Sequence, residues 1–133
     1  MVSSTPEKAA LAGDHIGADT RVIASAIASE SAAIILMDPR WPQPDRVLCL
    51  RSGAGWVEWG SGSGGTSWSL IDDGTGLGVL VSWGPAEPGA SAVNVTFHGE
   101  TTQVPVTNGH WVWIVEGIRE DEIDDPANFE WVS

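Results

Sequence analysis

Several kinds of residue are scarce in this chain of 133 residues, and each scarcity excludes a class of protein. Cys49 is the only cysteine, so no disulfide can form within the chain. Lys8 is the only lysine, so the sequence offers no lysine for a phosphate-binding loop. No apolar run approaches the length of a membrane span. The first 20 residues lack the basic start and apolar stretch of a secretory signal, so we expect a cytoplasmic protein.

Basic residues are scarce as well, because 6 Lys and Arg face 18 Asp and Glu, which gives a net charge of -12. Such a surface repels the phosphates of nucleic acid and of anionic lipid, so we expect neither as a partner. The same field allows a basic protein partner. Acidity also keeps a protein in solution, and that explanation needs no partner at all.

The size of the chain and its 42% hydrophobic content suit one domain with a buried core. We expect an N-terminal segment over 1–20, a β-domain over 21–118 and an acidic tail over 119–133. Thr5 can cap a short helix that has Pro6 at its first position. The tail is predicted to be the least tightly held segment, because acidic residues dominate its first half. The sequence leaves open that Phe129 and Trp131 tether its end by packing on the sandwich.

Residues 21–37 fit two interpretations. Val22, Ile23, Ala26 and Ile27 would share one face of a helix, whereas the β-branched residues around Ser29-Glu30-Ser31 fit a strand, a turn and a second strand. We adopt the second interpretation. RVLCLR and WVEW, joined by residues 52–55, predict the next two strands.

Two turns predict a meander of three strands over residues 92–116. The first is a two-residue loop at Gly99-Glu100, and the second is Asn108-Gly109, the strongest short hairpin signal in the chain. Together they predict these neighbours: Val93 with Val106, Val95 with Val104, Val106 with Trp111, and Val104 with Trp113. One inward-facing set follows: Val93, Val95, Phe97, Val104, Val106, Trp111, Trp113 and Val115.

Short strands with frequent turn signals and no long amphipathic helix predict an all-β fold. The expected architecture is an antiparallel two-sheet sandwich of the immunoglobulin-like kind. The Cys, Trp, Cys core of true immunoglobulin domains is absent, so the prediction rests on the strand pattern alone.

The stretch from Gly55 to Glu116 contains GWVEWGSGSGG and LGVLVSWGPAEPGASAVNVTFHGETTQVPVTNGHWVWIV. This part of the chain resembles a group of small actinobacterial proteins of unknown function. The shared features are a Gly/Ser/Asn-rich join, a turn of the WG-x-A kind and a closing hairpin with a PV-x-NG pattern. The resemblance implies a β-sandwich, and it implies neither an activity nor catalytic residues.

Motifs that carry chemistry are absent or lack their context. The glycines of residues 60–65 match G-x-G-x-x-G, but no helix follows to receive a pyrophosphate. The three histidines are scattered without metal-ligand spacing, and the acidic cluster 120–125 lacks the pattern of a calcium loop. No serine stands in a G-x-S-x-G elbow. We therefore predict no cofactor, metal or catalytic residue.

The most informative residues are the tryptophans. If Val57 faces the core, alternation along a strand puts Trp59 inside and leaves Trp56 outside on the face of Glu58. Trp41 stands between Arg40 and Pro42 in a proline-rich loop. Exposed tryptophans beside loops are typical of recognition surfaces, so the predicted binding residues are Trp41, Trp56 and Glu58. Gly60 to Gly65, with no side chain larger than serine, is predicted to be a mobile connector.

Two functions fit these observations. The first is a non-enzymatic binding module whose acidic surface meets a basic protein partner, in a regulatory or toxin-neutralising role. The second is a domain that binds a carbohydrate or small molecule on Trp41 and Trp56, with or without hydrolysis. Their salt dependence separates them, because charge-led association weakens with ionic strength and stacking on an indole does not.

Overall fold

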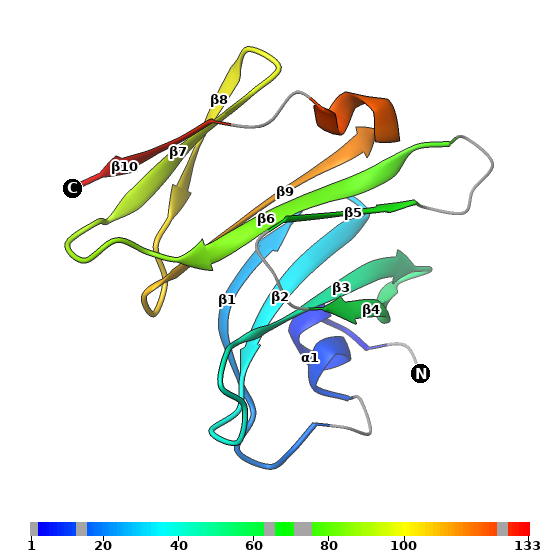
Figure 1. Ribbon diagram of the computed structural model, residues 1–133. Helices are drawn as coiled ribbons and strands as arrows, with labels where there is room; N and C mark the ends of the chain where they lie inside the picture. The colour runs from blue at the N-terminus through cyan, green and yellow to red at the C-terminus, as the bar shows by residue number, and fades with distance from the viewer. Residues whose placement is uncertain (1–2, 13–15, 63–65, 71–75, 125–127) are drawn as a thin grey trace. The chain divides into compact units, whose positions relative to one another are not determined.

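The computed structural model describes residues 3–12, 16–62, 66–70, 76–124 and 128–133. Over these residues the protein has ten strands, one α-helix and one short 3-10 helix (Figure 1). The chain divides into two compact units, which we call unit 1 (Met1–Ser63) and unit 2 (Gly64–Ser133). The all-β prediction is confirmed, but the unit boundary falls inside the expected domain 21–118, within the Gly/Ser run.

Unit 1 is a four-stranded antiparallel sheet in which the strands follow their sequence order. The strands are β1 (Arg21–Ile27), β2 (Ser31–Met37), β3 (Asp45–Ser52) and β4 (Gly55–Gly62). The strand, turn, strand interpretation of residues 21–37 is therefore confirmed. So is the turn between β3 and β4, where Gly53 has a φ of 62° that few other residues adopt.

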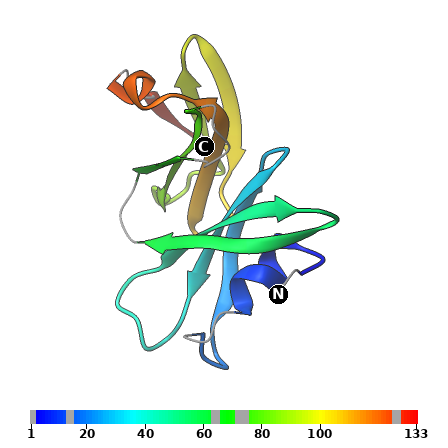
Figure 2. The same ribbon diagram turned by 90° about the vertical axis from the view of Figure 1, so that its right-hand side faces the viewer.

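Helix α1 (Pro6–Leu11) covers one face of this sheet (Figures 1 and 2). It forms as predicted, because the Thr5 hydroxyl accepts a hydrogen bond from the Lys8 amide at 3.2 Å. Its alanines are small enough to bring the helix close to the strands. The resulting core consists of Ala9, Ala10, Ala32, Ile34, Leu36, Val47, Cys49 and Trp56.

Unit 2 consists of two three-stranded antiparallel sheets, with the orders β5-β6-β9 and β10-β7-β8. Their strands are β5 (Thr66–Leu70), β6 (Gly78–Pro85), β7 (Ala92–Phe97), β8 (Glu100–Pro105), β9 (His110–Ile118) and β10 (Asn128–Val132), and the 3-10 helix η1 spans Glu120–Asp124. Both sheets contribute to one core: Leu80, Val93, Val95, Phe97, Val104, Trp111, Trp113 and Ile118. Unit 2 is thus a small two-sheet sandwich, and its immunoglobulin-like character remains a prediction.

The first predicted turn of the meander is shifted. The turn residues are His98 and Gly99, both with positive φ, so β7 and β8 pair with Val95 opposite Thr102 and Val93 opposite Val104. The predicted register is therefore wrong by two residues. Side chains alternate with a period of two, so this shift leaves every side chain on its predicted face. The predicted inward-facing residues belong to the core or pack against it, with the exception of Val106.

The second predicted turn is confirmed, but the pairing beyond it is wrong. Asn108 and Gly109 both have positive φ, and Thr107 and His110 form a bridge across them. After this bridge β8 stays with β7 while β9 pairs with β6 in the other sheet. The turn therefore joins two sheets instead of extending one, and the expected pairs of Val106 with Trp111 and of Val104 with Trp113 do not form.

The end of the predicted loose tail is held by strand pairing, and the Phe129 ring packs against Trp111, which is the tethering that the sequence left open. Strand β10 pairs with β7 along its whole length, from Asn128 opposite Thr96 to Val132 opposite Ala92. In η1 the Glu122 carboxylate accepts a hydrogen bond from the Arg119 amide at 2.9 Å and lies 3.6 Å from His98 Nδ1. Backbone pairing with the edge of β7 stabilises the segment despite its charge.

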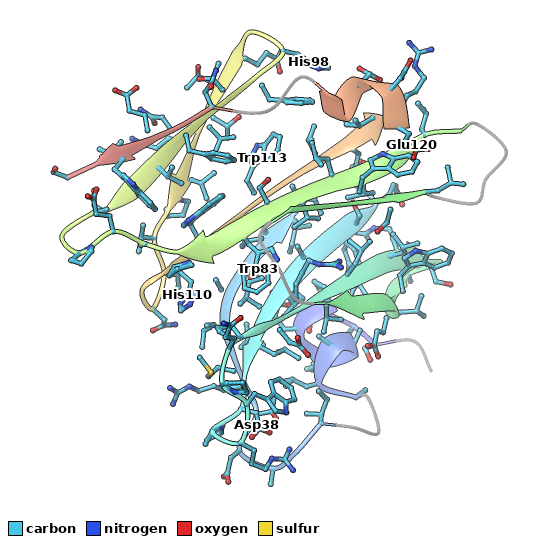
Figure 3. The ribbon with its side chains drawn as sticks, in the orientation of Figure 1. Asp38, Trp83, His98, His110, Trp113 and Glu120 are labelled. Atoms are coloured by element: carbon cyan, nitrogen blue, oxygen red, sulfur yellow. The ribbon has the colours of Figure 1, made fainter. Side chains whose placement is uncertain are left out.

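Trp113 provides a test of the unit 2 core. It is 7% exposed, its ring meets Phe97 edge to face at 5.5 Å, and it lies between the two sheets (Figure 3). Replacement by alanine leaves a cavity, so Trp113→Ala should lower the free energy of unfolding by about 3–5 kcal/mol in urea melts. Trp59→Ala, which removes an indole that is 48% exposed, is the matched control. A loss below about 1 kcal/mol for Trp113→Ala would contradict this packing.

Candidate functional site

The structure places Trp56 in the core of unit 1 and not on its surface. Its side chain is 4% exposed, and the Arg51 guanidinium lies 4.6 Å from its ring. The backbone of Trp56 also bonds in both directions to Ser3, with N···O distances of 2.7 and 2.9 Å. The prediction of Trp56 as an exposed contact residue is therefore wrong.

The error lies in the assumption that Val57 faces the core, and a β-bulge follows later in the same strand. Cys49 pairs with Glu58 but Leu48 pairs with Gly60, so Trp59 is an extra residue in β4. The face covered by α1 is that of Cys49, and hence of Trp56 and Glu58, instead of the face of Val57. Trp59, expected in the core, is 48% exposed, and Glu58 is exposed as predicted.

The glycine-rich run is only in part the connector that was expected. Gly60, Ser61 and Gly62 belong to β4 and pair with Leu48, Val47 and Arg46 of β3. This part of the prediction is wrong, because backbone pairing needs no large side chain. Residues 63–65 lie outside the described part of the chain.

Trp41 lies beside a shallow pocket in the loop between β2 and β3. The pocket has a volume of about 280 Å³ and is lined by Trp41, Pro42, Gln43, Pro44 and Asp45. Trp41 is half-buried because its ring also packs against the core that contains Trp56. Trp41 and Trp56, both predicted to bind, therefore pack into the same core and do not form a shared binding surface.

Asp38 organises the loop that carries Trp41. Its buried carboxylate accepts hydrogen bonds from Arg40 Nε at 2.8 Å and Nη2 at 2.6 Å, and from the Thr20 hydroxyl at 2.6 Å. Its backbone oxygen accepts a hydrogen bond from the Trp41 amide at 2.9 Å. A side chain at Gly17 would collide with the Arg40 guanidinium, so a glycine there permits this arrangement. The hydrogen bonds from Arg40 and then Thr20 hold the pKa of Asp38 well below its ordinary value.

Two strongly exposed aromatic residues of unit 2 were not predicted as site residues. Phe129 is 45% and Trp131 is 40% exposed, and both project from the same face of β10. They lie opposite Val95 and Val93 of β7, whose side chains face the core, and the Phe129 ring lies 5.1 Å from that of Trp111. Alternation of aromatic and polar residues in NFEWV was the signal for this strand, and the preceding acidic run obscured it.

The charge of the protein is distributed unequally between the units. Residues 64–133 hold 11 of the 18 acidic residues and 1 of the 6 basic ones, for a net charge of -10, whereas residues 1–63 hold 7 and 5, for -2. Exposed carboxylates lie close to β10 in sequence: Glu120 and Asp121 in η1 and Glu130 in the strand itself. Phe129 and Trp131 therefore belong to the strongly acidic unit.

Cys49 is placed as a core residue and not as a reactive thiol. Its sulfur lies 3.5 Å from the Pro6 carbonyl oxygen. Burial, reinforced by the charges of Glu58 and Glu7, raises the pKa of the thiol to about 12. Among the residues that the structure describes, no group of three His, Cys, Asp or Glu side chains is arranged to hold a metal ion. No helix in the same part of the chain is long and apolar enough to cross a membrane.

Comparison of the chain with protein-family models, with curated proteins and with solved structures gave no match.

The ionisation of Asp38 predicts how acid affects unit 1. Its carboxylate is favoured in the folded state, so its contribution to stability is complete above the ordinary Asp pKa of about 4. That contribution is lost as the pH falls below this value towards the lowered pKa of the folded state. Asp38→Asn should therefore be less stable than the native protein near pH 7, and the difference should shrink below about pH 4. Urea melts across this range test it, with the exposed Glu87→Gln as control, and a difference independent of pH would contradict the assignment.

Proposed function

We propose that the protein is a non-enzymatic binding module that recognises a basic protein partner through the surface of β10. The observation that carries the proposal is a pair of large exposed aromatic rings, Phe129 and Trp131, on one face of a strand in a unit with a net charge of -10. We call this surface, made of Phe129, Glu130 and Trp131, the β10 surface.

Aromatic rings and charges contribute differently to such an interface. A tryptophan or phenylalanine offers about 150–250 Å² of contact area and is typical of the residues that dominate binding energy. The surrounding carboxylates attract a basic partner at long range and increase the rate of association. The β10 surface combines both features. The exposed Trp59, in contrast, belongs to unit 1, whose net charge is only -2.

A non-enzymatic role is supported by the chemistry of the described residues. The only thiol, that of Cys49, is buried and its pKa is raised far above neutral pH, so it is a poor nucleophile. His98 lies at a turn of unit 2 beside a carboxylate, and His110 lies at another turn of that unit. A regulatory or toxin-neutralising role in the cytoplasm fits an acidic module, since such a surface can cover a basic active site. Membership of the actinobacterial group stays a prediction.

Binding of a small molecule or sugar beside Trp41 is the second candidate. The pocket in the loop between β2 and β3 favours it, since one indole and two prolines line it. Its volume of about 280 Å³ is at the lower limit of ordinary ligand sites, which run from about 300 Å³ upwards. Trp56 cannot contribute, because it is buried.

A basic probe peptide tests the leading proposal. We expect a fluorescein-labelled peptide of alternating lysine and valine, seven residues long, to bind the protein in fluorescence anisotropy and to bind more weakly as salt rises. Trp131→Ala should weaken binding at least about tenfold, since a tryptophan at the centre of an interface commonly contributes about 2 kcal/mol or more. Glu130→Gln should weaken it less and reduce its salt dependence.

Matched variants in unit 1 control for general effects. Trp59→Ala removes an indole of similar exposure, and Glu58→Gln removes one exposed carboxylate. Both should bind the peptide as the native protein does. Equal losses for Trp131→Ala and Trp59→Ala, or no binding of the peptide at all, would refute the proposal.

A further inference from the structure

We infer that the partner binds as an extended segment that pairs with the outer edge of β10 and adds a fourth strand to the sheet β10-β7-β8. The inference rests on the proposed function and names the form in which the partner is recognised. It assigns the contact to the backbone of β10 as well as to its side chains.

The first argument is the position of β10 in its sheet. In the described part of the chain β10 pairs with β7 on one side, and the sheet order places no strand on its other side (Figure 1). Alternate residues of such an edge strand direct their N–H and C=O groups away from the sheet. An extended peptide can satisfy these groups, as in the strand-addition mode of recognition.

The second argument is the pattern of side chains along the strand. Phe129 and Trp131 project to the face that carries the core, and Glu130 projects to the opposite face. A strand paired beside β10 would place apolar side chains next to the two rings and basic side chains next to Glu130. The preferred partner segment therefore alternates apolar and basic residues.

The opposite edge of this sheet is less suited to the same role. Strand β8 presents mainly polar exposed residues, Glu100, Thr101, Thr102 and Gln103, and it ends at Pro105, which has no N–H to donate. Polar residues and proline are typical of edges protected from pairing. Of the two edges, β10 alone carries exposed aromatic rings.

Charge selects a basic segment in preference to a second copy of the chain. Two copies paired through β10 would bring together two units that each carry a net charge of -10, and their Glu130 side chains would share one face. Repulsion of this kind opposes self-association at low salt. A basic segment gains from the same field.

Backbone methylation of the probe peptide tests the inference without changing the protein. Two versions of the lysine-valine peptide carry N-methyl groups on alternate amides, one version on the lysines and the other on the valines. All N–H groups on one edge of a strand come from alternate residues, so only one version has the edge that faces β10 blocked. We expect that version to bind at least tenfold more weakly than the unmodified peptide and the other to bind within about twofold of it.

The outcomes distinguish failure of strand addition from failure of the proposed binding function. If both methylated peptides bind like the unmodified one, or both lose binding equally, recognition does not use one strand edge and the inference is overturned while the proposed function stands. If the unmodified peptide does not bind, the proposed function itself fails. A dimer of the free protein in sedimentation that Trp131→Ala dissociates would assign the edge to a second copy and overturn the choice of partner.

Discussion

Each sheet of this protein has an apolar face that must be removed from water, and what covers that face determines the rest of the structure. In unit 1 the cover is helix α1, a single short helix whose alanines allow it to approach β2, β3 and Trp56 closely. In unit 2 two sheets cover each other, and Trp111 and Trp113 fill the space between them. The cover ends at β10, where Phe129 and Trp131 extend the core face to the edge and stay 45% and 40% exposed. The proposed binding surface thus lies where the apolar face of the sheet reaches its edge and stays partly exposed to water.

Local signals predicted much of this architecture. The cap at Thr5, the turn at Asn108-Gly109 and the strand pattern of residues 21–37 each depend on a few adjacent residues, and each is found in the structure. The inward-facing set of unit 2 was also predicted, even though the register of β7 and β8 was wrong by two residues. A period of two makes the face of a strand easier to predict than its partner.

The errors arose where long-range pairing or one extra residue decides the outcome. Helix α1 covers the face of β4 that carries Trp56 and not the face of Val57, and WVEWG does not show which face a distant helix will cover. The bulge at Trp59 adds a residue that the same pattern does not predict either. The switch of β9 to the sheet of β6 is a tertiary event that the Asn108-Gly109 turn does not encode. Strand β10 was missed because its acidic neighbours are typical of a solvated tail, so Phe129 and Trp131 were considered only as residues that tether the tail and not as binding residues.

The most direct test of the central claim is amide hydrogen exchange over residues 128–132, followed by NMR in the absence and presence of the lysine-valine peptide. In the free protein the amides that bond to β7 should exchange slowly, and those on the outer edge should exchange at rates near those of an unstructured chain. Addition of the peptide should slow the outer set and leave the amides of β4 unchanged. Rapid exchange of all β10 amides in the free protein, or no change in the outer set when the peptide is bound, would contradict a recognition edge at β10.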